Sequence, residues 1–252
     1  MRRLLLAAFF PVLALAPAQA LAVLPMIDVY AGGYVWNASL SGDLEYDGDE
    51  VDMEDDLGFG RERHNVFFLG VEHPVPFVPN ARLRHMALDD SARGEVQQEF
   101  EFGGVTYEAE DDVRSDYDLT MTDLALYYGL PLPTVDVNLG VNIRALDIDA
   151  RVRTEDSSKD ERVDADGIFP MLHGSTQVDL PFTGLYAGAE ANVISYSGNS
   201  LRDGRAYLGW TSDFALGAEL GYQILNLRVD DLDDLDADID KAGPYLGLSL
   251  RF

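Results

Sequence analysis

The chain ends in PYLGLSLRF, residues 244–252, and this stretch decides the fold. Every second residue in it is apolar, which is the spacing of one face of a β-strand; these residues are Leu246, Leu248, Leu250 and Phe252. The 252-residue chain carries a formal net charge of −27, so a bare apolar stripe at its very end needs an apolar environment. We predict that this face of the last strand contacts lipid.

The same alternation recurs earlier in the chain. Apolar residues occupy alternate positions in LGVNIR (139–144), LYAGAEANV (185–193) and ALGAELGYQI (215–224). Alternation with period two is typical of half-buried strands, and no segment of the sequence sustains a helical period. The sequence therefore predicts an all-β protein.

The polar face of these strands contains glycine and other small residues with isolated charges. A soluble barrel buries its apolar face and would carry more long polar side chains outside, whereas a membrane barrel is apolar outside and polar inside. A closed barrel also satisfies its backbone groups within lipid. We predict a transmembrane antiparallel up-and-down barrel, with a soluble barrel as the alternative. Charges predicted to pair in the lumen are Glu72, Arg82, Arg84, Arg144, Glu190, Arg205, Glu219 and Arg251.

The spacing of the segments predicts ten strands. Short linkers (PVPFVPN, PLPTVD, PFTG and TSD) follow the even-numbered strands, and longer acidic ones follow most of the others, as expected for short periplasmic turns and long extracellular loops. Eight strands is the alternative, if 80–90 and 168–180 are not both membrane strands. The predicted strands are 27–39, 64–73, 80–90, 117–130, 135–152, 168–180, 184–196, 201–211, 214–229 and 242–252.

The amino-terminal sequence MRRLLLAAFFPVLALAPAQALA (1–22) has a basic start, a short apolar core and a small-residue site. This pattern predicts a secretory signal peptide, cleaved after Ala20 or Ala22. Pro11 and Pro17 interrupt the run and argue against a membrane-spanning helix. Residues 23–252 then form a single barrel domain, held together without cysteines and expected in the outer membrane. The acidic charge argues against nucleic acid as a partner.

Two short motifs resemble known features of outer-membrane proteins. Gly32-Gly33, in DVYAGGYVWNASLSG (28–42), resembles the motif of the outer-membrane β-barrel family named for a GlyGly pair in the first strand. Phe252, with Leu250, Leu248 and Leu246 before it, looks like the terminal signal read by the barrel assembly machinery. That family has no established activity to transfer to this chain. The glycine pair also fits a bend or bulge where the closing strand approaches closely.

The histidines offer one candidate for chemistry. If the centre of PVPFVPN is the centre of its hairpin, His64 faces Asp89, with Asp90 adjacent. A His–carboxylate pair can act as a general base, but such a pair is more often an ordinary polar contact where strands leave the bilayer. No G-x-S-x-G motif occurs. We therefore expect no catalytic activity, with a surface hydrolase using His64 and Asp89 or Asp90 as the alternative.

Acidic runs occupy three loops: GDLEYDGDEVDMEDD (42–56), YEAEDDVRSDYD (107–118) and DDLDDLDADID (230–240). Asp236, Asp238 and Asp240 alternate, and oxygen ligands suit calcium. Lys241 and Gly247 stand where an EF-hand would need glycine and glutamate, so we expect a solvated face and no cofactor. Diffuse binding of divalent cations, bridging to lipopolysaccharide, is the alternative. We expect a monomer that contacts outer-membrane lipid, with a narrow lumen plugged by side chains; a narrow channel is the other possibility.

Overall fold

A computed structural model describes residues 27–252, except 47–48, 97–98, 103, 110, 131, 133–134, 157, 213 and 233–234. The predicted signal peptide (1–22), with its cleavage site at Ala20 or Ala22, lies outside the described residues. Within them, no helix is long and apolar enough to cross a membrane.

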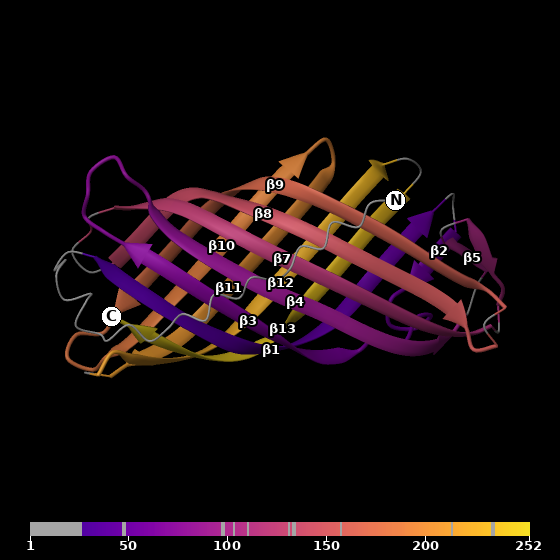
Figure 1. Ribbon diagram of the computed structural model, residues 1–252, viewed down its shortest axis with the longest axis horizontal. Coiled ribbons are helices and arrows are strands. Elements are labelled where there is room, and N and C mark those ends of the chain that lie inside the picture. Colours follow the sequence, from indigo (N-terminus) through magenta and orange to yellow (C-terminus); the bar gives the residue numbers. More distant parts are fainter. Residues whose placement is uncertain are drawn as a thin grey trace, which may run out of the picture.

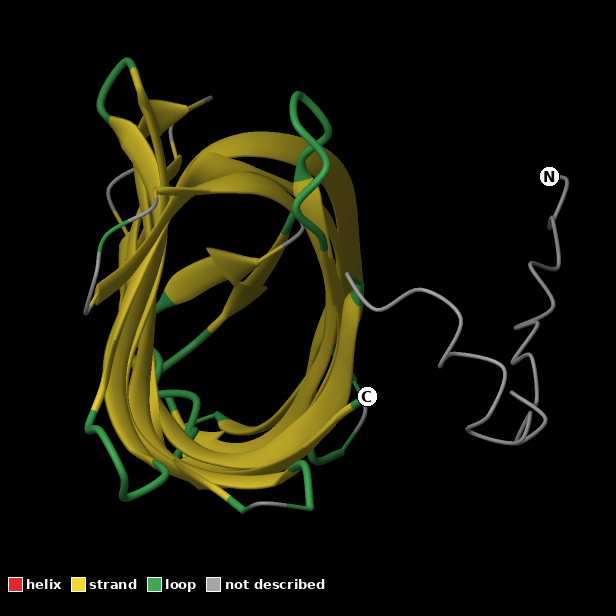
Figure 2. Cartoon of the chain, turned by 90° about the vertical axis from the view of Figure 1, so that its left-hand side faces the viewer, coloured by secondary structure: helices red, strands yellow, loops and turns green. Residues whose placement is uncertain are grey.

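Ten long antiparallel strands form a closed barrel (Figures 1 and 2). Each pairs with the next along the chain, and the last pairs with the first, which closes the ring. Ten strands are therefore correct and eight is wrong: both segments in question, 80–90 and 168–180, lie in full barrel strands. The strands are β1 (Asp28–Tyr46), β3 (Arg61–Glu72), β4 (Asn80–Glu95), β7 (Asp112–Leu130), β8 (Val135–Thr154), β9 (Asp160–Asp179), β10 (Leu185–Tyr196), β11 (Asn199–Thr211), β12 (Leu216–Leu232) and β13 (Leu235–Arg251).

Several strands extend further toward the long loops than the sequence predicts. β9 begins at Asp160 rather than at 168, and β13 begins at Leu235 rather than at 242. These extensions are acidic, so they lack the apolar alternation that marks a strand, yet each continues the ladder of its neighbour. Three short strands in the loops were not predicted: β2 (Asp49–Asp52), β5 (Phe100–Phe102) and β6 (Val105–Tyr107).

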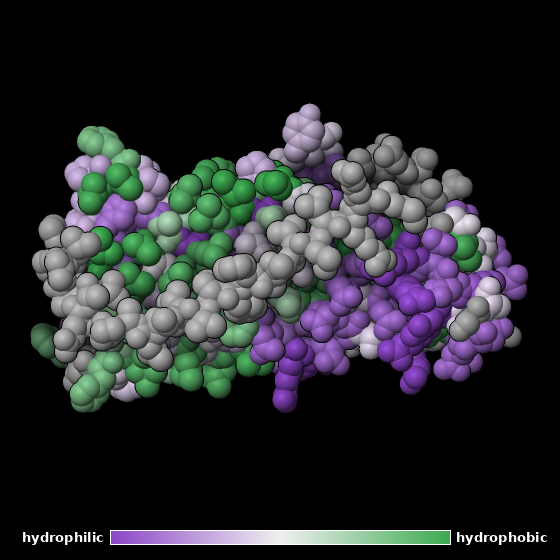
Figure 3. Space-filling model, viewed as in Figure 1, coloured by the Kyte–Doolittle hydropathy of each residue, from purple (hydrophilic) through white to green (hydrophobic). Residues whose placement is uncertain are grey.

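Large apolar side chains cover the outside of the barrel from the short turns to about half its height, and we call this region the apolar belt. Figure 3 shows the contrast between this apolar half and the polar half at the long loops. A soluble monomer rarely exposes so large an apolar surface, so this is the membrane-spanning part. Its outermost exposed residues toward the long loops are Val35, Phe67, Leu83, Leu124, Ile143, Ile168, Val193, Ile224 and Leu246.

The barrel closes where the last strand meets the first. The Phe252 N–H donates to the Val29 carbonyl at 2.8 Å, and the Val29 N–H donates back at 3.3 Å. All four apolar residues of the terminal stripe are exposed outward: Leu246, Leu248, Leu250 and Phe252. The stripe is therefore part of the apolar belt.

Gly32 and Gly33 lie on this closing seam, opposite Ser249 and Leu248 of β13. A β-carbon on Gly32 would overlap the Leu248 carbonyl oxygen and lie 2.6 Å from the ring of Phe68. The register runs unshifted through both glycines, so there is no bulge at this point. The missing β-carbon at Gly32 therefore lets the backbone of β13 approach closely and the ring of Phe68 pack against β1.

Two apolar cores lie inside the barrel. The lumen core faces inward, from the level of the buried charges toward the long loops, and comprises Tyr34, Trp36, Ala38, Val66, Met86, Leu88, Met121, Met171, Leu201, Leu225 and Tyr245. The loop core joins inward-facing residues of β1, β7 and β8 to the segments around β2 and β5–β6, so loop segments lie across this end of the lumen. Its residues are Leu40, Val51, Met53, Leu57, Phe59, Val96, Phe100, Tyr107, Val113 and Val152.

Candidate functional site

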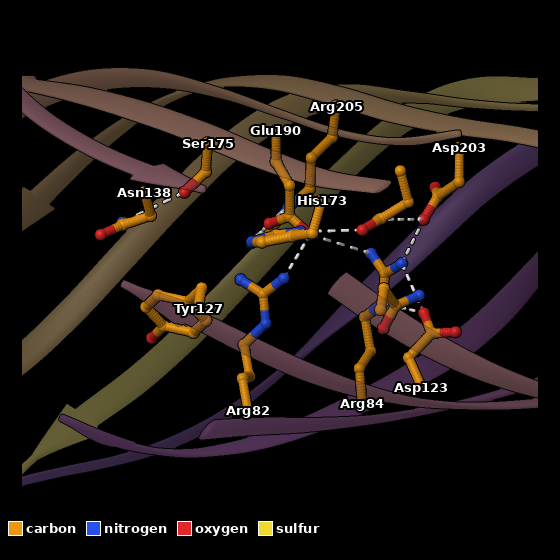
Figure 4. A network of polar contacts seen from close by, with 12 residues as sticks. Arg82, Arg84, Asp123, Tyr127, Asn138, His173, Ser175, Glu190, Asp203 and Arg205 are labelled. Carbon is orange, nitrogen blue, oxygen red and sulfur yellow. Dashed lines mark hydrogen bonds and ion pairs between the residues drawn. The ribbon is translucent and has the colours of Figure 1, made fainter. Parts of the chain in front are cut away.

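The lumen contains a network of buried charges (Figure 4). Asp123 of β7 accepts from Arg144 at 2.7 Å and from Arg84 at 2.7 Å. Asp203 of β11 accepts from Arg144 at 2.8 Å and also contacts Arg84. All four side chains are at most 3% exposed. Two carboxylates are thus bridged by two guanidinium groups, so each charge has opposite neighbours.

Glu190 of β10 is the centre of a second group. Arg205 donates to it at 2.9 Å, Arg82 contacts its other oxygen, and Arg84 lies 3.9 Å from it. Glu190 is 4% exposed. Burial of a charge is tolerated only when opposite charges and hydrogen bonds surround it. This group therefore holds three strands, β4, β10 and β11, at a fixed separation across the lumen.

The remaining predicted lumen charges lie closer to the short turns. Glu219 accepts from Arg205 at 3.3 Å. Glu72 accepts from the Tyr127 hydroxyl at 2.9 Å and lies 3.5 Å from Arg251. All eight residues predicted to be lumen charges therefore have an ionic partner within this network.

Asp123 and Asp203 are members of the network that the sequence reasoning missed. The eight predicted charges comprise five arginines and only three glutamates. Because unpaired buried charges are strongly unfavourable, this imbalance of two is a signal that two further acids must face the lumen. Asp123 and Asp203 restore the balance: Asp123 precedes the outward-facing Leu124, and Asp203 lies two residues before Arg205, on the same face of β11.

Beyond the lumen core, Lys241 lies buried near the mouth of the barrel, outside the membrane-spanning segments. Its ammonium group donates to the Tyr117 hydroxyl at 2.7 Å. Burial lowers the pKa of Lys241 to about 8, although the nearby carboxylates of Asp90 and Glu62 oppose this shift. Burial likewise raises the pKa of Asp90. These groups link β13 to β4 and β7 above the membrane.

His64 and Asp89 do not face each other. Asn65 pairs with Ala87, so the same register places His64 opposite Leu88. The hairpin centre predicted from the sequence lies half a residue too far along the chain, and a slip of one residue moves a side chain to the other face. His64 is buried in the lumen, 2% exposed, against Trp36. Its Nε2 has no hydrogen-bond partner among the described residues.

Asp89 is exposed on the outer face, while Asp90 lies on the lumen side. Both line a pocket of about 540 Å³ that opens above the apolar belt. Six carboxylates line it, together with Ser91, Tyr117, Arg151 and Arg162; they belong to Glu62, Asp89, Asp90, Asp116, Asp118 and Asp149. His64 is not part of this lining. The structure therefore does not assemble the predicted His–Asp pair.

The alternating aspartates of the last loop lie on the outer face of β13. Asp238 contacts Arg228, and Asp240 accepts from Asn226 at 3.0 Å. Asp236 is exposed and lies opposite Glu45 of β1. Among the described residues no group of His, Asp or Glu side chains is arranged to hold a metal ion.

No family model and no curated protein matches the chain. Solved structures do match, and these neighbours are bacterial outer-membrane β-barrels. The chain is similar to the outer membrane protease OmpT from Escherichia coli, at 9% identity and a TM-score of 0.54, over 89% of this chain and 97% of that one. Ail of Yersinia pestis aligns at 10% identity and a TM-score of 0.35, over 90% and 99% of the two chains.

The translocator domain of the autotransporter NalP from Neisseria meningitidis aligns at 11% identity and a TM-score of 0.41, over 90% of this chain and 88% of that one. At such identities a likeness concerns the fold alone. The comparison with OmpT supports the closed antiparallel barrel, and the activities of these proteins are not transferred to this chain.

Proposed function

We propose that the protein is an integral outer-membrane barrel with a closed lumen, whose acidic long-loop end serves a structural or surface-interaction role. The observation that carries this proposal is the inverted arrangement of the barrel. Large apolar side chains face outward around it, and the lumen charges pair with one another inside. Such an arrangement is stable only with lipid outside.

Three layers support a lumen closed to diffusion. Buried ion pairs around Glu190 and Asp203 occupy the membrane level. The lumen core follows, and the loop core lies across the far end. In small barrels, side chains fill the interior in this way. We therefore prefer a plugged barrel to a narrow channel.

We also propose that the barrel has no catalytic activity. A general base must lie within hydrogen-bonding reach of the group from which it takes a proton. His64 is buried beside Trp36 and does not line the acidic pocket, Asp89 points to the opposite face, and no described residue forms a hydrogen bond with the His64 Nε2. These positions argue against a hydrolase built on His64 with Asp89 or Asp90.

The partners follow from the same features. The apolar belt fits outer-membrane lipid, and the acidic outer half fits lipopolysaccharide bridged by divalent cations. Phe252 fits recognition by the barrel assembly machinery. Gly32-Gly33 supports membership of the family named for its GlyGly motif. We propose a monomer, because each of the ten barrel strands pairs with both of its neighbours and the ring is closed.

The location is tested by fractionating cells that express the full chain. We expect the protein in the outer-membrane fraction, extractable only with detergent, and migrating faster on gels before boiling than after. This difference in migration reports a folded barrel. Recovery from the periplasm without detergent would contradict an apolar belt that contacts lipid.

A further inference from the structure

One strand of the barrel has a long unpaired edge outside the membrane. β9 pairs with β8 from Asp160 to Val178, but with β10 only from Leu172 onward. No described residue pairs with the other edge between Asp160 and Met171. Ile168 marks the limit of the apolar belt, so the edge from Asp160 to Gly167 lies above it. These eight residues span roughly 26 Å.

Above the apolar belt, β4, β7, β8 and β9 continue as one sheet, whose two edges are β9 and β4. The β4 edge is covered by the chain itself. β4 continues beyond its pairing with β3, and the loop around Gly58 lies against it. A β-carbon on Gly94 would meet the backbone of Asp56 and Leu57, and one on Gly58 would meet the carbonyl of Arg93. Exposed strand edges are usually covered or blocked, because their free N–H and C=O groups are templates for another strand. The β9 edge has no comparable cover among the described residues.

The charges along the β9 edge indicate what kind of strand it would accept. Asp164 lies directly opposite Asp149, and Asp166 directly opposite Asp147. Like charges in directly opposed positions are unfavourable. Arg162 contacts Asp149, but Asp164 and Asp166 have no ionic partner in the part of the chain that the structure describes. Both side chains are exposed. A neighbouring strand with basic side chains would place opposite charges beside them.

We propose that the edge Asp160–Gly167 of β9 binds an extended basic peptide segment by strand addition. Main-chain hydrogen bonds to the free edge supply affinity, and basic side chains at alternate positions select the partner. A second copy of this chain is a poor occupant, because two acidic edges would repel each other. Pro170 lies just below this edge. It has no N–H to donate to a neighbouring strand, as a residue in a central strand would.

The test uses full-length barrel in detergent and a fluorescent ten-residue peptide of alternating arginine and threonine. We expect this peptide to bind, while the glutamate–threonine version does not. Two further peptides carry methyl groups on alternate backbone amides, one at the odd and one at the even positions. Methylation keeps the charge of the peptide but removes the N–H groups that strand pairing needs. We expect at least one of these two peptides not to bind. Hydrogen exchange should show new protection within 160–167.

Matched variants distinguish binding at this edge from a general attraction of the peptide to the acidic surface. Replacing Asp164 and Asp166 with asparagine should weaken binding about tenfold. The control replaces Glu54 with glutamine and Asp55 with asparagine; both are exposed in the loop on the other side of the sheet, and binding should not change. The proposal is overturned if no peptide binds, if both methylated peptides bind as well as the parent, if protection appears elsewhere, or if the control weakens binding equally.

Discussion

Glu190→Ala is expected to destabilise the folded barrel more than removal of a partly exposed lumen charge. Glu190 contacts Arg82 and Arg205 directly and lies 3.9 Å from Arg84. Without it, three guanidinium groups that are at most 12% exposed lose a shared partner inside the membrane. Removing one member of a buried ion pair costs about 3–5 kcal/mol. The measurement is the urea concentration at which the fast-migrating folded band disappears.

Glu72→Ala is the matched control for Glu190. Glu72 also pairs with an arginine, but its side chain is 30% exposed and its partner Arg251 is 55% exposed. Such partly exposed pairs contribute about 0–1 kcal/mol, and the Tyr127 hydroxyl keeps the Tyr30 hydroxyl as a hydrogen-bond partner, so this variant should unfold much closer to the wild type than Glu190→Ala. A partial rescue of Glu190→Ala by Arg82→Met would support the electrostatic reason. Equal midpoints for Glu190→Ala and Glu72→Ala would show that the central network does not stabilise the barrel.

Deleting Phe252, or replacing it with alanine or aspartate, is expected to reduce the amount of folded protein in outer membranes severalfold. The phenylalanine side chain alone contributes about 1.5–3 kcal/mol when fully buried, and here it is only partly covered. Its backbone, however, joins the last strand to Val29. If assembly begins from this residue, its loss leaves an open edge in lipid, where each unsatisfied backbone group costs several kcal/mol.

Leu216→Ala is the control for Phe252, because Leu216 is also exposed outward and lies opposite Leu250 on the neighbouring strand. The amount of heat-modifiable protein is measured for the wild type, Phe252→Ala and Leu216→Ala at equal expression. We expect Leu216→Ala to match the wild type. Equal amounts in all three would show that Phe252 is merely one more lipid-facing residue.

The fold was predictable because the membrane imposes period-two alternation, which stands out in segments such as 139–144 and 215–224. All ten strands lie where the alternation predicts them. Their outer ends were missed, since both faces of β9 above Ile168 meet water and the alternation disappears. The loop core was missed for another reason: its members, such as Leu57 and Phe100, come from separate loops and are brought together only by the fold.

The inside of the barrel was less predictable than its outside. Alternation identified the lumen charges, but pairing partners depend on register, and His64 shows the effect of an error of one residue. Asp123 and Asp203 could have been found from the imbalance between five arginines and three glutamates in the lumen. The unpaired edge of β9 could not, because it depends on β10 ending at Tyr196 while β9 continues to Asp160.

The central claim is a barrel whose lumen is closed by its own side chains, and planar-bilayer conductance tests it most directly. Refolded wild-type protein is added to the bilayer, and insertion is scored separately by flotation with vesicles and by heat-modifiable migration. We predict no conductance above that of the bare bilayer, because the Glu190 and Asp203 groups and the lumen core occupy the interior. Discrete, reproducible conductance steps from inserted wild-type protein would contradict the closed lumen.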